Sequence, residues 1–344
     1  MIINIEEAQI NQLIFHKISA NDKLSIVNNH SYEFEIGEEL DVLKTIFLKR
    51  FQESIYSYEF KHDVDINLNV LFTLLRTIYN NEDFVERTKD IFTHLKSVSR
   101  HPNIKDGELF VIKYEDIKYN GTYYEAVGIY KVENKENFVE PINDISGNSR
   151  LKFRKGVGNK KLAKACLILF TEIPYTVFVL ENGDKDTDYW LKDFLNLRLK
   201  KGSINDTGNF LSCTRNFIVK ELPEQFEVSK ADQVELLNKS VQFFKKKENF
   251  NIEEFTDEVI AQPELVETFT KYKEEYQKKH EVEIADNFTI SESAVKKQSR
   301  AFKSVIKLDK NFHIYVHGNN QYIKRGYDEK TGMYYYQLFF KEEE

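Results

Sequence analysis

Hydrophobic and polar residues alternate most regularly between residues 107 and 132. Two alternating runs, 107–117 and 122–132, flank Asn120-Gly121, a dipeptide that tight hairpin turns favour because both central residues need positive φ. These runs predict a β-hairpin. Further apolar stretches extend it to one mainly antiparallel sheet over residues 107–180, with strands at 151–154, 165–170 and 175–180.

Apolar residues recur every three or four positions in much of the remaining chain, which is the pattern of amphipathic helices. In the first 200 residues the patterns predict helices at 38–51, 67–79, 82–97 and 187–197, and short strands at 12–18, 23–27 and 31–36. After a polar loop at 200–208 they predict helices at 230–247, 252–261, 263–279 and 291–303, then strands at 311–317, 321–325 and 333–340.

The order of these elements predicts an α+β fold with two domains. Residues 1–200 are expected to form an α+β domain with a central, mainly antiparallel sheet and flanking helices. Residues 201–344 are expected to form a helical domain that ends in a short three-stranded β meander.

The composition is that of a folded globular protein, since 41% of the 344 residues are hydrophobic and 31% are charged. No apolar run approaches the ~20 residues of a membrane-spanning helix, and the first residues lack the basic start of a signal peptide. The two cysteines, Cys166 and Cys213, are too few for a disulfide framework. The sequence therefore predicts a cytoplasmic protein with reduced thiols and no contact with a membrane.

Charge is distributed unevenly around a net value of −7. The window from 150 to 164 holds seven basic residues and no acidic one, and the window from 296 to 310 holds six basic residues and Asp309. Because the rest of the chain is strongly acidic, these windows favour local attraction of a polyanion. A solvated lysine-rich surface is the simpler explanation of either window taken alone.

The two windows supply the candidate contacts with DNA phosphates. Four basic residues between Lys296 and Lys307 recur at helical spacing and predict one cationic stripe along a helix. A glycine turn at 156–158 predicts backbone N–H groups that can approach phosphates. The predicted nucleic-acid-binding residues are Arg150, Lys152, Arg154, Lys155, Lys160, Lys161, Lys164, Lys296, Lys297, Arg300, Lys303 and Lys307.

No local motif supports catalysis. The sequence holds no glycine-rich phosphate-binding motif, neither cysteine has an adjacent histidine, and no cofactor or metal site is predicted. Asp184, Asp186 and Asp188 alternate as in a calcium loop, although an acidic turn before a helix explains them better. They make a metal-dependent phosphodiesterase the least favoured alternative function.

Several segments resemble the bacterial nucleoid-associated proteins of the NdpA/YejK-like family. The resemblance is carried by residues 10–18 (INQLIFHKI), 106–112 (DGELFVI) and 188–195 (DYWLKDFL), and it covers essentially the whole length of the chain. It implies association with the bacterial nucleoid and binding to DNA, without an established catalytic activity.

The sequence thus predicts a non-enzymatic, nucleoid-associated protein that binds double-stranded DNA mainly through its backbone phosphates. The alternative is an adaptor that docks on a nucleoid or defence protein through the aromatic segment 334–340. A homodimer is compatible with either function.

Overall fold

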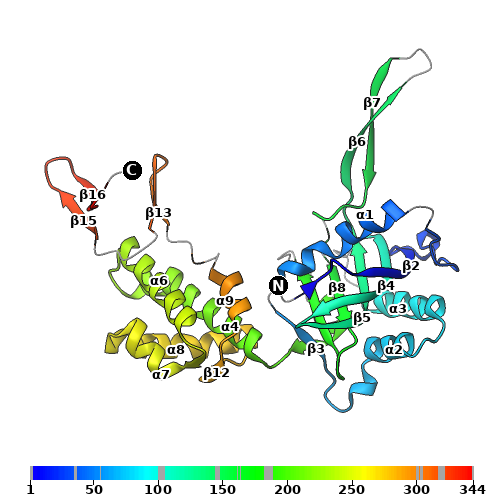
Figure 1. Cartoon of the computed structure of the whole chain (residues 1–344), viewed down its shortest axis with the longest axis horizontal. Helices are drawn as coiled ribbons and strands as arrows, with labels where there is room; N and C mark the ends of the chain where they lie inside the picture. Colours follow the sequence, from blue (N-terminus) through cyan, green and yellow to red (C-terminus); the bar gives the residue numbers. More distant parts are fainter. Residues whose placement is uncertain are drawn as a thin grey trace. The chain divides into compact units, whose positions relative to one another are not determined.

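The chain forms two compact units, Met1–Lys200 and Lys201–Glu344 (Figure 1). The structure, a computed structural model, describes residues 3–34, 37–54, 56–99, 105–143, 148–160, 162, 164–181, 189–299, 302, 305–316 and 322–342. A mainly antiparallel sheet in the first unit and helices followed by short β-hairpins in the second confirm the predicted α+β class.

The first unit is built on an eight-stranded antiparallel sheet. Its strand order is β1-β4-β5-β8-β9-β3-β10, and β2 also pairs with β4. The strands are β1 (Ile3–Asn4), β2 (Gln9–Ile18), β3 (Tyr58–Phe60), β4 (Gly107–Tyr119), β5 (Thr122–Val132), β8 (Lys164–Leu169), β9 (Thr176–Glu181) and β10 (Leu197–Leu199). The predicted hairpin is confirmed, because Asn120 and Gly121 have φ of 50° and 88° and join β4 to β5.

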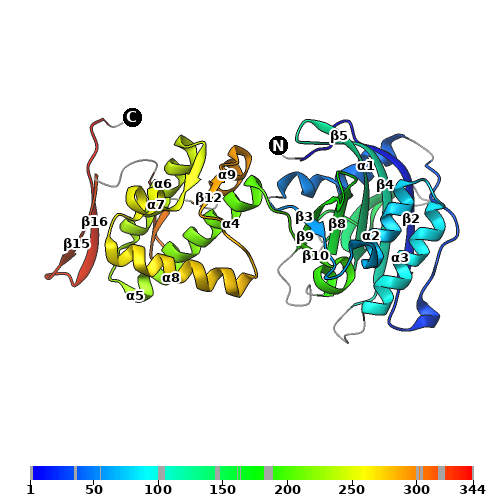
Figure 2. The ribbon, with the colours of Figure 1, turned by 90° about the horizontal axis from the view of Figure 1, so that it is seen from below.

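Helical segments cover both faces of this sheet (Figure 2). They are α1 (Gly37–Phe47), the 3-10 segment η2 (Lys49–Glu53), α2 (Val70–Tyr79), α3 (Phe84–Val98) and the π-helical segment η5 (Tyr189–Leu195). The segments α2, α3 and η5 share one large core with β4, β5 and β8. On the opposite face, Phe47 of α1 and Phe51 of η2 pack against Tyr130 of β5. Because both faces are covered, every residue of β8 is buried.

One hairpin leaves the sheet. The strands β6 (Glu136–Asn143) and β7 (Ser149–Gly156) pair only with each other among the described residues, in a two-stranded antiparallel sheet. In the chain they lie between β5 and β8, which are neighbours in the large sheet. The prediction of a single sheet over residues 107–180 is therefore wrong for this segment, which we call the arm.

The second unit is mainly helical. Its helices are α4 (Ser203–Asn216), α5 (Leu222–Gln225), α6 (Lys230–Lys246), α7 (Ile252–Phe255), α8 (Pro263–His280) and α9 (Glu292–Gln298), with π-helical segments η6 (Phe217–Glu221) and η7 (Thr256–Ile260). A cluster of phenylalanine rings fills the core, in which Phe210 packs against Phe250 and Phe255. A short sheet of β11 (Asn249–Asn251) and β12 (Asn287–Thr289) completes this core.

Two separate hairpins end the chain. The strand β13 (Val305–Leu308) pairs with β14 (Phe312–Tyr315), and β15 (Ile323–Asp328) pairs with β16 (Met333–Leu338). The predicted three-stranded meander is therefore wrong, because the described strands pair two by two. In the first hairpin Ile306 is fully buried and packs with Val234 of α6, so this contact fixes β13 against the helices of the second unit.

Three local predictions also differ from the structure. The expected strand at 23–27 is a 3-10 turn at Asp22–Leu24 followed by one bridge between Lys17 and Ile26. The described part of 31–36 contains no strand, and the expected loop at 200–208 already contains the start of α4. Among the described residues, no helix has the length and apolar character needed to cross a bilayer.

Candidate nucleic-acid interface

Four of the predicted basic residues lie on one strand of the arm. Arg150, Lys152, Arg154 and Lys155 belong to β7, and all four are exposed to solvent. Figure 1 shows the arm rising out of the body of the first unit. The structure therefore brings these charges together on one projecting element.

Three of these charges share a face. Arg150, Lys152 and Arg154 alternate along β7, and residues two apart on a strand point to the same side. Successive members are ~6.6 Å apart along an extended strand, about twice the ~3.4 Å axial rise per phosphate of one B-DNA strand. We call these three residues the cationic face of the arm.

One carboxylate accompanies the cationic face. The Nε of Arg154 donates a hydrogen bond of 2.7 Å to Oε2 of Glu140, and Lys152 lies directly across from Glu140 in the register. The hydrogen bond and the positive charge of Arg154 hold the pKa of Glu140 below its usual value, and Lys152 adds to the effect. Glu140 is therefore ionised at neutral pH and offsets one of the three positive charges.

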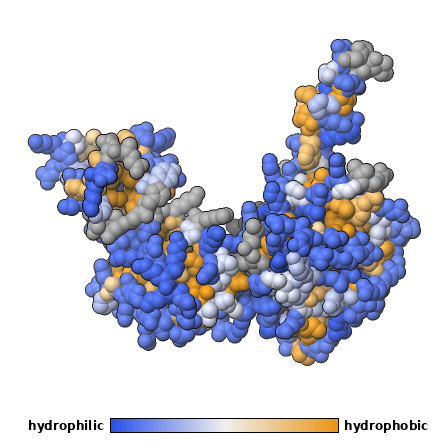
Figure 3. Space-filling model, viewed as in Figure 1, coloured by the Kyte–Doolittle hydropathy of each residue, from blue (hydrophilic) through white to orange (hydrophobic). Residues whose placement is uncertain are grey.

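The opposite side of the arm is apolar. Leu151 and Phe153 of β7 alternate with the cationic residues, and the register places them across from Pro141 and Val139 of β6. Phe153 is 77% exposed, Leu151 61% and Val139 52%. Figure 3 shows apolar surface exposed along the arm. We call Val139, Pro141, Leu151 and Phe153 the apolar face.

The glycine turn at the base of the arm already holds a carboxylate. The backbone N–H of Lys160 donates to Oε1 of Glu136 at 2.8 Å. A Cβ on Gly158 would come within 2.4 Å of the carboxyl carbon of Glu136, so glycine permits this close approach. The N–H group of Lys160 is therefore bound to a protein carboxylate rather than directed at phosphate. Lys161 lies outside the described residues.

Lys164 does not belong to the surface. It lies in β8, where its side chain is 7% exposed and its Nζ is 2.7 Å from Oε1 of Glu133. Lys131 contacts the same carboxylate oxygen at 2.9 Å, and both ammonium groups lie over the ring of Tyr189. Burial lowers the pKa of Lys131 and Glu133 opposes that shift. The prediction that Lys164 contacts DNA is therefore corrected: it is part of a buried ion-pair cluster.

The second basic window does not form the predicted helical stripe. Helix α9 ends at Gln298, whose side-chain amide donates to Oγ of Ser212 at 3.1 Å. Lys296 is exposed on α9 and Lys297 is half-buried, whereas Lys307 is exposed on β13 across from His313. Arg300 and Lys303 lie outside the described residues. Lys296 and Lys307 therefore lie on a helix and on a strand, and they do not belong to one helical stripe.

The described residues contain neither a metal-ligand cluster nor a reactive thiol. Within the described ranges, no group of three or more His, Cys, Asp or Glu side chains is arranged to hold a metal ion. Asp184, Asp186 and Asp188 lie outside those ranges. Cys166 and Cys213 are buried, and burial raises the pKa of both thiols, that of Cys213 to about 12. A thiol that stays protonated is a poor nucleophile.

Sequence reasoning found β7 but missed its partner β6 and the projection of the arm. The signal in β7 is the strict alternation from Arg150 to Arg154, in which basic and apolar residues take turns. If neither face of such a strand is covered by another element, the alternation predicts two exposed faces, one basic and one apolar.

A family model described as nucleoid-associated protein YejK matches residues 14–334. No curated protein and no solved structure matches the chain. The match includes the arm and the described elements of both units from α1 to β15.

Proposed function

The chain belongs to the YejK family of nucleoid-associated proteins, and from this premise we propose that it binds double-stranded DNA through backbone phosphates, without catalysing a reaction on it. The observation that carries the proposal is the cationic face: three basic side chains on one side of a projecting, solvent-exposed strand. In this proposal the protein acts in the cytoplasm, on the nucleoid.

Phosphate contacts explain why an acidic protein binds DNA. The net charge of −7 repels a polyanion from most of the surface, so attraction is restricted to a local cationic element. Each cation that neutralises a phosphate releases a condensed counterion, which favours binding at low salt. Arg150 and Arg154 add planar guanidinium groups that can hold phosphate oxygens in pairs.

The binding is proposed to be independent of base sequence. Beside the cationic face, β6 places Ile142, Glu140 and Phe138. The two apolar side chains cannot hydrogen-bond to base edges, and Glu140 already accepts a hydrogen bond from Arg154. Phosphate contacts fix position on the duplex and carry no sequence information by themselves. Lys155, at the base of the arm, and Lys296 and Lys307, in the second unit, are proposed as auxiliary phosphate contacts.

An adaptor function is the second candidate, supported by the hairpin of β15 and β16. Met333, Tyr334 and Tyr335 on β16 and Phe340 beyond it are at least half exposed. Aromatic residues of this kind are enriched where proteins bind one another. A partner that uses this hairpin would be a protein, and its binding would depend little on salt.

Fluorescence anisotropy with a 30-base-pair duplex tests the proposed function. The wild type is compared with a variant carrying Arg150→Glu, Lys152→Glu and Arg154→Glu. Loss of binding at low salt in the variant supports the proposal, and equal binding contradicts the assignment to the arm. Incubation of the same duplex with protein and Mg²⁺ or Mn²⁺ tests the phosphodiesterase alternative, for which cleavage would be the positive result.

A further inference from the structure

No element of the described part of the chain covers the apolar face of the arm. Val139, Leu151 and Phe153 are more than half exposed on a hairpin of only two strands. A two-stranded hairpin in water is at best marginally stable by itself, and grouped exposed apolar side chains mark an interaction surface. The cationic residues point to the other side, so this face is available to a partner other than DNA.

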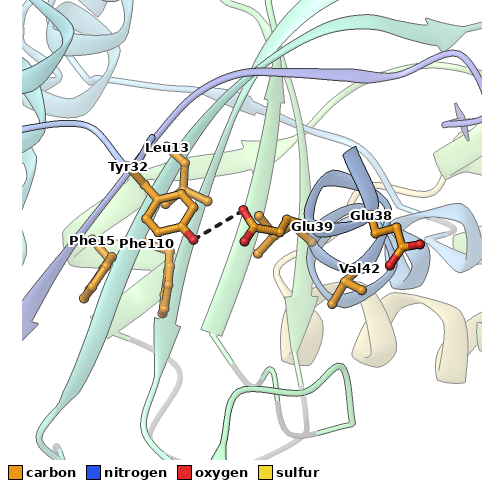
Figure 4. A pocket seen from close by; sticks show the side chains of 8 residues that line it. Leu13, Phe15, Tyr32, Glu38, Glu39, Val42 and Phe110 are labelled. Atoms are coloured by element: carbon orange, nitrogen blue, oxygen red, sulfur yellow. Dashed lines mark hydrogen bonds between the residues drawn. The ribbon is translucent and has the colours of Figure 1, made fainter. Parts of the chain in front are cut away.

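The same unit carries an apolar groove beside α1. Leu13 and Phe15 of β2, Phe110 of β4, Val42 of α1 and Tyr32 line a cavity of about 430 Å³ (Figure 4). The rings of Phe15 and Phe110 are stacked with centroids 5.3 Å apart, and Val42 is 57% exposed. We call these five residues the α1 groove. Its volume exceeds the ~150 Å³ that suffices to hold a benzene ring in a protein interior.

Two carboxylates lie at the rim of the groove. Glu38 and Glu39, in the first turn of α1, also line it, and Oε2 of Glu39 accepts a hydrogen bond of 3.3 Å from the hydroxyl of Tyr32. Figure 4 shows both glutamates beside the apolar side chains. The groove is therefore apolar inside and acidic at its rim, and its complement is an apolar side chain with a cation beside it.

The arm has this chemistry, and we propose that the apolar face of the arm docks into the α1 groove of a second copy of the chain. Phe153 supplies the aromatic ring, and Lys155, two residues further along β7 and therefore on the same side, supplies positive charge next to it. The occupant is a second copy because the arm rises away from the sheet that carries its own groove. Arm and groove lie in the same unit. In a two-fold symmetric dimer, the arm of each copy therefore docks into the groove of the other, which gives two equivalent contacts.

This arrangement leaves the cationic face outside the contact. Arg150, Lys152 and Arg154 point away from the groove when Phe153 points into it, because adjacent residues of a strand take opposite sides. The pairing of two copies does not depend on the proposed function and can be tested in the absence of DNA.

Disulfide trapping tests the contact. One chain carries Phe153→Cys, the other carries Val42→Cys with an affinity tag, and the two are mixed under mild oxidation. The native thiols of Cys166 and Cys213 are buried and do not compete. We expect a cross-linked heterodimer in high yield. The matched control is Lys152→Cys, one position away on the same strand but on the opposite face, for which we expect at least tenfold less product.

Three results would overturn the proposal. These are equal cross-linking of the Phe153→Cys and Lys152→Cys chains, cross-linking of Phe153→Cys only to itself, and a monomer mass for the wild type at all concentrations in light scattering. A second variant, Val42→Glu, keeps an exposed helix position and adds charge to the groove. We expect it to convert a dimer mass to a monomer mass, and an unchanged dimer would also overturn the proposal.

Discussion

Lys152 and Phe153 are neighbours in β7, yet their side chains leave opposite faces of the arm. One residue belongs to a row of cations and the other to a row of exposed apolar side chains. The arm therefore presents two chemistries from one short strand, and substitutions at adjacent positions are expected to affect different interactions.

The charge of Lys152 is predicted to contribute to DNA affinity and not to self-association. Lys152→Glu removes one phosphate contact and is expected to weaken binding to any duplex by roughly 1 kcal/mol, or about fivefold. Competition anisotropy with duplexes of different sequence measures the loss, which should be uniform. Lys271→Glu, at an exposed position of α8, makes the same charge change and should leave affinity nearly unaltered. Equal losses in both variants would point to net charge instead of the arm.

The ring of Phe153 is predicted to matter for self-association. Phe153→Ser keeps every charge of the arm, and loss of one aromatic anchor is expected to raise the dimer dissociation constant by about 30-fold, equivalent to about 2 kcal/mol. Analytical ultracentrifugation without DNA measures it. Lys152→Ser is the control on the other face, and a similar rise there would argue against the docking of the apolar face.

The buried cluster around Glu133 is predicted to stabilise the first unit. Glu133→Gln leaves the ammonium groups of Lys131 and Lys164 without their shared carboxylate. Breaking a buried ion pair typically lowers the free energy of unfolding by roughly 3–5 kcal/mol, and a change of this size is expected in urea titrations. Glu140→Gln, at an exposed ion pair on the arm, should have a much smaller effect because solvent screens the pair. Similar losses would show that burial of the cluster is unimportant.

Acid is predicted to destabilise the first unit through His16. This residue is fully buried: its Nδ1 accepts from the backbone N–H of Asn28 at 3.2 Å, and its Nε2 is 3.2 Å from Oγ1 of Thr88. Burial, and then the charge of Lys89, lower its pKa from 6.5 to about 4. The bond from Asn28 requires an unprotonated Nδ1, so the neutral ring carries its proton on Nε2.

The sign of the pH effect follows from this lowered pKa. Below pH 6.5 the unfolded chain protonates His16 and the folded chain does not until near pH 4, so the stabilisation present above pH 6.5 is lost between these values. The free energy of unfolding is expected to fall by up to about 3 kcal/mol from this residue. Urea titrations of the wild type and His16→Gln across pH 4–7 isolate the contribution, and parallel pH profiles would refute it.

Local sequence signals predicted much of the first unit's fold. The Asn120-Gly121 turn was recognisable because positive φ at two successive positions restricts the residue types. Strands β5, β8 and β9 were recognisable as apolar runs bounded by turns. The strand β6 was missed because it has no buried face, and Pro141 in its middle lowers its strand propensity.

The candidate site was only partly predictable. Lys164 belongs to a basic window in the sequence, but its burial depends on Glu133 and Tyr189, which come from other parts of the chain. Gln298, the last residue of α9, donates a hydrogen bond to Ser212, 86 residues earlier, and no spacing rule in the sequence shows this contact. By contrast, the two faces of the arm follow directly from the alternation in β7. Adjacent side chains of a strand point to opposite sides whatever the strand packs against, so the sequence alone assigns each residue to its face.

The salt dependence of DNA affinity tests the central claim most directly. The wild type is compared with Arg150→Ala, Lys152→Ala and Arg154→Ala combined, and with a charge-matched control combining Lys245→Ala, Lys246→Ala and Lys271→Ala at exposed positions of α6 and α8. Because each phosphate contact contributes ~0.9 to the slope of log affinity against log salt, the arm variant should lose up to about 2.7 and the control almost nothing. Equal slopes for all three proteins would contradict DNA binding through the cationic face.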